Sequence, residues 1–408
     1  MPKTTSKSLD VPQRGIVHLI GAGPGDPGLI TLKGLQCIQE AEVVIYDYLA
    51  APALLTHARP GTELIYVGKK GGDHTLSQDR INALIVEKAR QGHCVARLKG
   101  GDPYVFGRGG EEAEVLVENG IAFDVVPGVT AAVAASAYAG IPLTHRDLTA
   151  TVAFVTGHED PKKVTSNIDW RALATGIGTV VFYMGVKNLP RIVKNLTENG
   201  RAPDTPAAVI RWGTTSRQRT VTGTLLNIEE KVKAAGLKAP AIIVVGDVVG
   251  LREKLKWFED RPLFGKTVVV TRAREQASDL SEQLRKMGAD CLEIPTIAIT
   301  PMEDSSLIDK AIEQLPDYHW IVFTSVNGVT AFFDRLFLSG RDVRALGHIR
   351  TAAIGPATAN RLRSYGLGTD IVPESFRAES VVEAFQKEPM AGKRVLLPRA
   401  KEARPILP

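Results

Sequence analysis

The chain has 408 residues, with 50 Lys and Arg against 45 Asp and Glu and a formal net charge of +5 at neutral pH. This length suffices for two or three domains with hydrophobic cores, and a content of 44% hydrophobic and 23% charged residues is ordinary for a soluble globular protein. The longest apolar runs fall short of the ~20 residues that a membrane-spanning helix needs, so we expect no membrane segment.

The cysteines and the N-terminus favour a cytoplasmic protein. Cys37, Cys94 and Cys291 lie far apart without C-x-x-C spacing, which argues against a disulfide framework and a cysteine-based zinc site. Residues 1–14 are polar and lack the apolar core of a signal peptide, so we expect a disordered tail.

Short β-branched runs alternate with helical patterns along the chain. Predicted helices include residues 29–41, 77–92 and 109–120. This alternation predicts an α/β protein with largely parallel sheets. The predicted buried strands occupy residues 16–20, 43–46, 93–98, 121–126, 150–156, 178–184 and 240–246.

Two interruptions indicate domain boundaries. Residues 141–149 break the alternation and are expected to link two α/β lobes. Residues 207–225 then favour two strands joined by a polar turn, so the second lobe is expected to be mixed. A larger seam falls at 257–273, where Pro262 and Gly265 precede a new strand.

The chain stops just after a predicted strand at 393–400, so we expect the last α/β domain to be incomplete.

A glycine-rich segment, GAGPGDPG at 21–28, follows the first predicted strand. A dinucleotide site requires G-x-G-x-x-G, but the third glycine position holds Asp26, and Pro24 lacks an amide hydrogen. Asp47 ends the next strand and could bind a ribose, so a dinucleotide site stays an alternative.

Two further loops also follow predicted strands, LKGGDPYVFGRGGEE at 98–112 and the Pro-Gly turn within 125–137. Glycine lets the backbone approach a ligand closely, and parallel strands end at one edge of their sheet. The three loops predict one crevice lined by backbone amides, small side chains and few positive charges, which suits a nucleoside without phosphates.

Residues 15–257 resemble the uroporphyrinogen-III C-methyltransferases, a family of tetrapyrrole methyltransferases. The motifs that carry the resemblance are GAGPGDPGLITLKG, VVIYDYL, VGKKGG, LKGGDPYVFGRGGEE, PGVTAA, FYMGVKNL and APAIIVVGDVVGLREKLKWF. The resemblance implies two α/β lobes that hold S-adenosylmethionine in the cleft between them. It also implies two methyl transfers to uroporphyrinogen III, which give precorrin-2 for sirohaem or cobalamin. The cofactor-binding residues that it implies are Pro24, Gly100, Gly101, Asp102, Val105, Thr130, Ala131, Met184, Gly213 and Ala241.

The resemblance also implies catalytic and substrate-binding residues. Asp47 matches the family's proton acceptor and Lys69 its proton donor, although on sequence alone a strand-end turn residue and a solvated surface lysine are the favoured explanations. Lys70, Arg108 and Arg146 are candidates to bind the carboxylates of the substrate. The family also implies a homodimer.

From about residue 264 the chain resembles the uroporphyrinogen-III synthases, which cyclise hydroxymethylbilane. The matching segments are GKTVVVTRAREQASDLSEQLRKMGADCLEIPTI, FTSVNGV, AIGPATANRL and VPESFRAESVVEAF. Thr324, Ser325 and Asn327 are candidates to face this substrate, although a helix-capping turn explains them as well. Because this family is usually longer, we expect the synthase segment to be incomplete and doubt its activity.

The predicted domains are thus a methyltransferase at 15–258, with lobes at about 15–143 and 149–258, a linker at 259–265, and a synthase segment at 266–408. A methyltransferase acting on another precorrin and, less favoured, a nicotinamide-dependent oxidoreductase stay as alternatives. The chain has no basic block that indicates a nucleic-acid partner. His158, Glu159 and Asp160 are adjacent in sequence and so rarely converge on one ion, and we expect no metal site.

Overall fold

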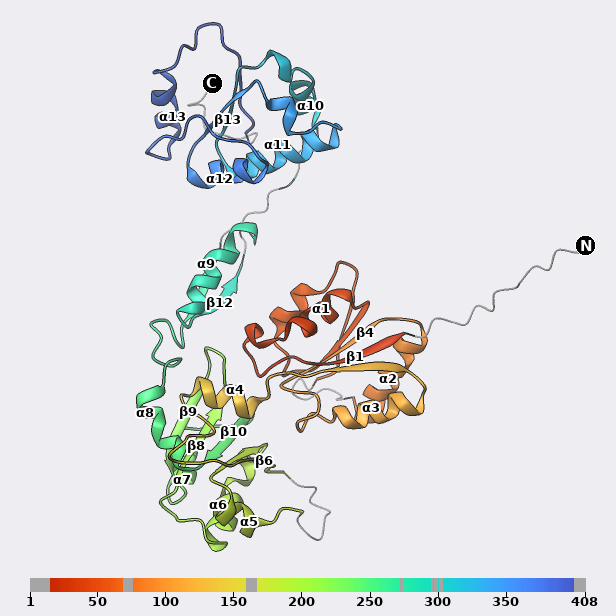
Figure 1. Cartoon of the computed structure of the whole chain (residues 1–408), viewed down its shortest axis with the longest axis vertical. Coiled ribbons are helices and arrows are strands. Elements are labelled where there is room, and N and C mark those ends of the chain that lie inside the picture. Colours follow the sequence, from red (N-terminus) through yellow and green to blue (C-terminus); the bar gives the residue numbers. More distant parts are fainter. Residues whose placement is uncertain are drawn as a thin grey trace, which may run out of the picture. The chain divides into compact units, whose positions relative to one another are not determined.

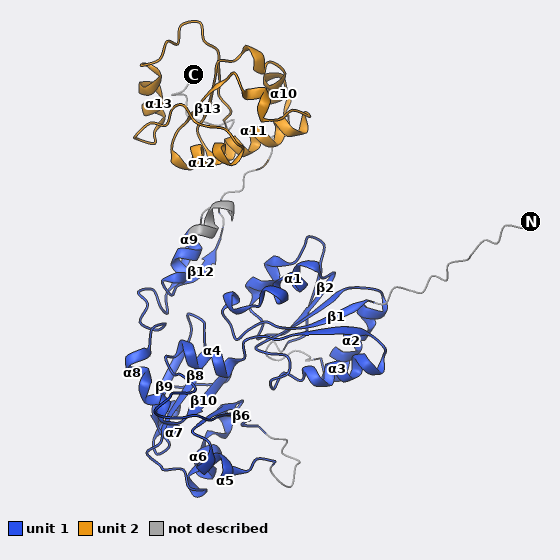
Figure 2. Cartoon of the chain, viewed as in Figure 1, with its two compact units in different colours: residues 1–297 blue, residues 298–408 orange. Residues whose placement is uncertain are grey.

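The computed structural model describes residues 15–68, 76–158, 167–271, 274–294, 296, 300 and 304–399. It divides into two compact units, Met1–Ile297 and Ala298–Pro408 (Figures 1 and 2). The predicted tail at 1–14, together with Lys69 and Lys70, lies outside the described residues. None of the helices in these ranges combines the length and apolar character that crossing a bilayer requires.

The first sheet of unit 1 is entirely parallel, as the sequence predicts. Its strand order is β3-β2-β4-β1-β5. Helix α1 (Leu32–Glu40) covers one face, and α2 (Gln78–Arg90) and α3 (Gly109–Glu118) cover the other (Figure 1). The strands are β1 (Ile16–Gly21), β2 (Val43–Tyr46), β3 (Glu63–Tyr66), β4 (Val95–Lys99) and β5 (Ala122–Val126).

Alternating side chains of these strands form two cores. Val17 and Leu19 of β1 pack with residues of α2 and α3, whereas Ile20 packs with residues of α1 on the opposite face. Because successive residues of a strand point to opposite faces, a sheet covered on both sides needs apolar residues throughout. Because all five strands are parallel, they end at the same edge of the sheet, where the loops that follow them lie together.

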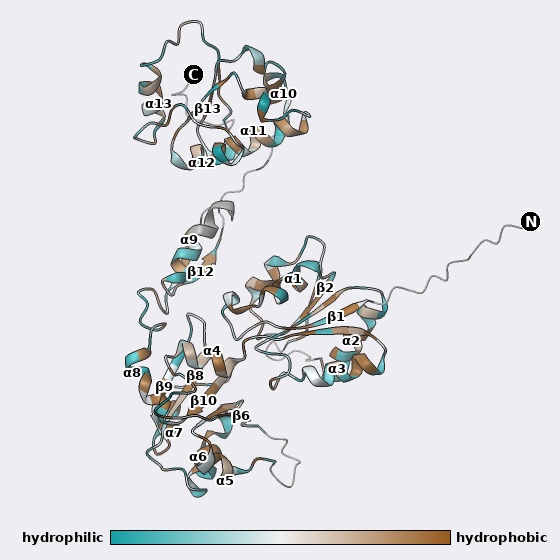
Figure 3. Ribbon diagram, in the orientation of Figure 1, coloured by the Kyte–Doolittle hydropathy of each residue, from teal (hydrophilic) through white to brown (hydrophobic). Residues whose placement is uncertain are grey.

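The second sheet is mixed, which confirms the prediction. Its order is β6-β7-β10-β8-β9, and only β6 and β7 pair in parallel. The apolar colour in Figure 3 concentrates on strands such as β8 and β10. Helix α4 (Ala131–Tyr138) packs on one face, and α5 (Trp170–Gly176), α6 (Leu189–Glu198) and α7 (Ile228–Ala234) pack on the other. The strands are β6 (Val152–Thr156), β7 (Thr179–Tyr183), β8 (Pro206–Arg211), β9 (Arg219–Thr224) and β10 (Ala241–Val245).

The rest of unit 1 follows the short helix α8 (Arg252–Leu255). Strands β11 (Thr267–Val270) and β12 (Asp290–Glu293) pair in parallel and are joined by α9 (Arg274–Lys286). This small α/β element groups with unit 1 by its contacts. The domain boundaries expected from the sequence stay a prediction.

Unit 2 contains a three-stranded parallel sheet with the order β14-β13-β15. Its core includes the fully buried Phe323, Phe332 and Phe333. The strands are β13 (Trp320–Phe323), β14 (Arg350–Ala353) and β15 (Val395–Leu396), and the helices are α10 (Ser306–Glu313), α11 (Val326–Leu338), α12 (Pro356–Ser364) and α13 (Ala378–Phe385).

Candidate functional site

Three glycine loops meet at the edge where the first sheet's strands end. Gly23 and Gly101 exchange two backbone hydrogen bonds, with N···O distances of 3.2 and 2.7 Å. A Cβ atom on Gly128 would lie 2.3 Å from the carbonyl oxygen of Gly101, and one on Gly21 would lie 2.5 Å from the Cα of Gly128. Only glycine permits this approach, which explains why the three loops carry it.

Asp102 joins two of these loops through backbone amides. Its Oδ2 atom accepts a hydrogen bond from the N–H of Gly128 at 3.0 Å, and its Oδ1 atom accepts bonds from Tyr104 and Val105 at 2.8 and 3.2 Å. Asp102 is not among the residues that line the neighbouring cavity. Its carboxylate organises the loops, and its contact with a cofactor stays a prediction.

A cavity of about 860 Å³ adjoins the loops and has walls from both lobes of unit 1. Most of the residues expected at a cofactor site line it. Arg146 does not, and is exposed in the segment between the lobes. The expected residues that line the cavity are Pro24, Asp47, Gly100, Gly101, Val105, Arg108, Thr130, Ala131, Met184, Gly213 and Ala241.

Backbone strain is concentrated at this cavity. Five non-glycine residues of the described ranges have φ between 50° and 70°, and all five line its walls. Such conformations cost free energy in non-glycine residues and persist where the surrounding structure imposes them, often at functional sites. The sequence predicts only two of these residues as site residues. The five are Phe106, Arg108, Met184, Trp212 and Thr214.

The cavity is more basic than the sequence predicts. Among the described residues, six Lys and Arg line it against three Asp, so the expectation of few positive charges is wrong. One of the six, Lys99, has its amine paired with the buried Glu112. The loops alone gave that expectation, whereas most of these cations come from other segments. The cations are Lys99, Arg108, Lys187, Arg217, Arg261 and Arg285, and the acids are Asp26, Asp47 and Asp290.

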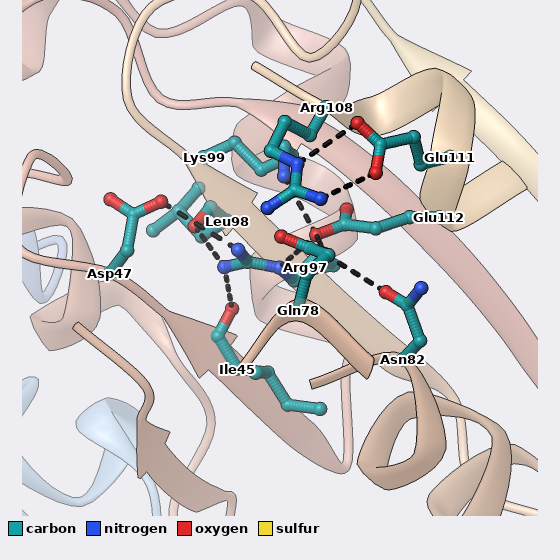
Figure 4. Close-up of polar contacts among 10 residues, drawn as sticks. All are labelled: Ile45, Asp47, Gln78, Asn82, Arg97, Leu98, Lys99, Arg108, Glu111 and Glu112. Atoms are coloured by element: carbon teal, nitrogen blue, oxygen red, sulfur yellow. Dashed lines mark hydrogen bonds and ion pairs between the residues drawn. The ribbon is translucent and has the colours of Figure 1, made fainter. Parts of the chain in front are cut away.

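A buried network of charges lies behind Asp47 (Figure 4). Glu112 at the start of α3 is 1% exposed, and its Oε1 atom accepts hydrogen bonds from Nζ of Lys99 at 2.7 Å and Nε of Arg97 at 3.2 Å. The Nη2 atom of Arg97 lies 3.7 Å from Oδ2 of Asp47. Burial lowers the pKa of Lys99, and the nearby charge of Arg97 lowers it further against the opposing effect of Glu112. Charge compensation thus extends from the interior to the cavity wall.

Asp47 also serves the turn that follows β2. Its Oδ1 atom accepts a hydrogen bond from the backbone N–H of Leu49 at 3.0 Å. The strand-end interpretation and a role at the cavity are therefore compatible, because the two carboxylate oxygens face different partners.

Tyr183 was missed at the sequence level. Its hydroxyl accepts a hydrogen bond from the N–H of Ala132 at 2.8 Å and lies 2.6 Å from Oγ1 of Thr130. Burial is the main cause that raises the pKa of Tyr183. The phenol thereby ties the start of α4, on the chain between the lobes, to strand β7 of the second lobe.

The candidates in unit 2 follow strand β13. Ser325 caps α11, since its Oγ atom accepts a hydrogen bond from the N–H of Gly328 at 3.0 Å. Thr324 and Asn327 flank this cap and are partly buried. The capping interpretation therefore holds for Ser325, and a contact of the three residues with a substrate stays a prediction.

Glu159 and Asp160, considered above as metal ligands, lie outside the described ranges. Within those ranges, no group of three or more His, Cys, Asp and Glu side chains is placed to hold a metal ion.

Known proteins resemble both parts of the chain. The family of Tetrapyrrole (Corrin/Porphyrin) Methylases matches residues 17–229, and the family of Uroporphyrinogen-III synthase HemD matches residues 278–408. A uroporphyrinogen-III C-methyltransferase of Bacillus subtilis is 44% identical over 380 residues, which are 92% of this chain and 78% of the relative.

Two further proteins match the first part alone. An S-adenosyl-L-methionine-dependent uroporphyrinogen III methyltransferase of Methanosarcina barkeri is 55% identical over 241 residues, or 59% of this chain and 94% of the relative. The crystal structure of a uroporphyrin-III-C-methyltransferase from Thermus thermophilus is 41% identical and has a TM-score of 0.50, covering 60% of this chain and 97% of that chain.

Proposed function

The chain belongs to the tetrapyrrole (corrin/porphyrin) methylase family, and from this premise we propose that it transfers two methyl groups from S-adenosylmethionine to uroporphyrinogen III. The product is precorrin-2, a precursor of sirohaem and cobalamin. The observation that carries the proposal is the cavity itself, where the three glycine loops, the strained residues and Asp47 meet.

The residues of the cavity fit S-adenosylmethionine, which carries no phosphate. Gly100 and Gly213 admit no side chain, because a Cβ atom would lie 2.4 Å from Cβ of Leu49 and 2.2 Å from Cβ of Ala135, respectively. Asp26 occupies the third glycine position of the dinucleotide motif and would repel a pyrophosphate. The acidic residue at this position favours the methyl donor over a nicotinamide dinucleotide.

The basic side chains of the cavity suit uroporphyrinogen III, which carries eight carboxylates. Arg108 immediately precedes α3 and has a left-handed backbone conformation, and its side chain pairs with Glu111 at 2.6 Å. Arg217 stacks over Trp212 at 4.7 Å from the ring centroid. Exchange of the exposed Arg108–Glu111 pair for a substrate carboxylate costs little, because surface ion pairs contribute about 0–1 kcal/mol.

When bound, S-adenosylmethionine supplies an activated methyl group. The chain aligns an electron-rich pyrrole carbon with it and excludes water, and alignment supplies roughly 7–11 kcal/mol in favourable cases. Asp47 accepts the proton that the substrate releases, and the buried Arg97 holds its carboxylate toward the cavity. Lys69 stays the proposed proton donor, and Lys70 and Arg146 stay proposed substrate contacts.

The C-terminal segment supports a second function. Its match to the uroporphyrinogen-III synthase family favours cyclisation of hydroxymethylbilane at the ends of strands β13 and β14, near Thr324, Ser325 and Asn327. The product of this reaction is the substrate of the first, so fusion of the two shortens the exposure of an oxidation-prone intermediate. Incubation with hydroxymethylbilane tests it, since an active segment yields the type III isomer and an inactive one leaves the spontaneous type I isomer.

Calorimetric titration of the full chain with S-adenosylhomocysteine and, separately, with NAD tests the main proposal. We expect saturable binding of the first ligand alone. Binding of NAD alone would overturn the methyltransferase in favour of the oxidoreductase. The proposal also includes a homodimer, a cytoplasmic location and the lack of a nucleic-acid partner. Analytical sedimentation tests the homodimer.

A further inference from the structure

Two chains of contacts lead from one segment to Asp26 in the first glycine loop. The segment is residues 257–264, which connects the second lobe to β11, and we call it the exit segment. Asp26 lines the cavity and fixes its own loop, since Oδ1 accepts a hydrogen bond from the N–H of Gly28 at 2.8 Å. The backbone carbonyl oxygen of Asp26 also stays within the loop, where it accepts a hydrogen bond from the N–H of Leu29 at 3.1 Å. The backbone N–H and Oδ2 of Asp26 each bind one of the two chains of contacts.

The first chain consists of hydrogen bonds that start at Glu259. Its Oε1 atom accepts a bond from Nε2 of Gln218 at 2.8 Å, and Oε1 of Gln218 accepts a bond from the N–H of Thr214 at 2.8 Å. Oγ1 of Thr214 in turn accepts a bond from the N–H of Asp26 at 2.9 Å. The first and last of these bonds join segments that are distant in sequence, whereas the bond between Gln218 and Thr214 closes the turn between β8 and β9. Gln218 is buried, with 2% of its surface exposed.

Thr214 is held in its conformation by this chain. Its φ is +70°, which is unfavourable for a β-branched residue, and the bond to Gln218 compensates for part of that cost. Glu259 is held in turn by Thr220 at 2.6 Å and by Nη2 of Arg252 at 2.5 Å. The position of Thr214 therefore depends on a carboxylate that lies in the exit segment.

The second chain runs through aromatic rings. The hydroxyl of Tyr138 donates a hydrogen bond to Oδ2 of Asp26 at 2.7 Å. The ring of Tyr138 lies 5.1 Å from that of Trp257 and 4.7 Å from that of Phe258, between centroids, and Phe258 contacts Phe264 at 5.4 Å. Edge-on contacts of this kind fix ring positions as well as bury area.

We propose that Asp26 is a positioning residue through which the exit segment sets the conformation of the glycine loop, and thereby the affinity of the cavity for its cofactor. The proposal rests on the function proposed above, because the cofactor is S-adenosylmethionine. Tyr138, Gln218 and Glu259 do not line the cavity. An effect of these residues on cofactor affinity must therefore pass through the residues that they hold.

Three variants of the full chain test the proposal by calorimetric titration with S-adenosylhomocysteine. Tyr138→Phe removes one hydroxyl and keeps the ring, and Glu259→Gln weakens the pairing with Arg252. Gln218→Glu keeps an acceptor for Thr214 but places a second carboxylate against Glu259. The matched control is Tyr365→Phe, which removes a hydroxyl that binds Arg361 in unit 2.

We expect each of the three variants to bind S-adenosylhomocysteine about tenfold more weakly than the parent chain, the scale of one lost hydrogen bond to a charged group, and the control to bind like the parent. In turnover, KM for S-adenosylmethionine should rise while kcat at saturation stays unchanged. Thermal unfolding of each variant identifies any that fails to fold, and Tyr138→Phe is the mildest of the set.

Parent-like affinity in the folded variants would overturn the proposal, even if their unfolding temperatures fall, because that result describes a purely structural role. A fall in kcat without a change in KM would overturn it as well. If the parent chain binds no S-adenosylhomocysteine, the proposed function is refuted and this coupling with it. The titration of the parent chain alone separates that outcome from a failure of the coupling.

Discussion

Arg97 bridges Glu112 and Asp47, with its Nε atom 3.2 Å from Oε1 of the first and its Nη2 atom 3.7 Å from Oδ2 of the second. Arg97 is 3% exposed, whereas the side chain of Asp47 is 28% exposed. Its Nη1 atom donates to the carbonyl oxygens of Ile45 and Leu98. The guanidinium is therefore fixed on every side, and it fixes the carboxylate that faces the cavity.

Asp47→Asn should leave cofactor binding within about twofold of the parent and lower kcat by ~10²–10⁴, the usual contribution of a general acid or base. The amide keeps the shape of the turn but cannot accept a proton. Steady-state methyl transfer and calorimetric titration measure the two quantities. Asp317→Asn, in an exposed pair with Arg394 of unit 2, is the matched control. Parent-like turnover of Asp47→Asn would remove Asp47 from the chemistry.

Glu112→Gln should lower the free energy of unfolding by about 3–5 kcal/mol, because it leaves Arg97 and Lys99 buried without their counter-charge. Denaturant unfolding at neutral pH measures the loss. Glu198→Gln, which removes an exposed pair with Lys194, should change the free energy by less than ~0.5 kcal/mol. A loss no larger than that of the control would show that the buried network contributes little to stability.

Gly128→Ala should lower both the unfolding temperature and the affinity for the cofactor. The new Cβ atom would lie 2.3 Å from the carbonyl oxygen of Gly101 and would push two glycine loops apart. Gly176→Ala adds the same methyl group where no atom lies within 4 Å. Thermal unfolding and titration with S-adenosylhomocysteine compare the two. Equal behaviour would mean that the loops need not touch for the cavity to form.

The stabilisation that the partly buried phenol of Tyr138 provides should be lost in alkali, where the unfolded chain gives up the phenol proton. Burial, followed by the hydrogen bond to Asp26, raises the pKa of the phenol above its ordinary value of 10.0. The unfolded chain loses this proton at a pH where the folded chain keeps it, so the stabilisation is complete below about pH 10 and declines as pH rises further. Tyr138→Phe should therefore lose less unfolding free energy than the parent between about pH 9 and 11. Parallel declines in the two proteins would contradict this account.

The sequence predicts the sheets because the strands are buried on both faces and carry continuous apolar runs. Strand β3 was missed although residues 64–67 form a short apolar run like those of the other strands. It lies at the edge of its sheet, and three of its four residues, among them Glu63 and Leu64, are exposed. The mixed second sheet was predicted from the polar turn within 207–225, because a short turn requires its two strands to be antiparallel.

Parts of the site could not be predicted from the sequence. Trp212 and Thr214 adopt positive φ although their residue types disfavour it, so only the surrounding contacts reveal the strain. The bond between Gln218 and Glu259 spans 41 residues, and that between Asp26 and Thr214 spans 188. The first pair follows from the packing of the exit segment on the second lobe and the second pair from the packing of the two lobes, and no local sequence pattern records either. The sequence shows Asp26 as a departure from the dinucleotide motif. In the structure its carboxylate binds the N–H of Gly28 and the hydroxyl of Tyr138, which glycine could not do.

The measurement that tests the central claim most directly is the number of methyl groups that the full chain adds to uroporphyrinogen III. The chain is incubated without oxygen with S-adenosylmethionine and uroporphyrinogen III, and the tetrapyrrole is then analysed by mass spectrometry. The account predicts a dimethylated product and two molecules of S-adenosylhomocysteine for each tetrapyrrole consumed. An unmethylated tetrapyrrole, from a chain that is folded and supplied with both substrates, would contradict it.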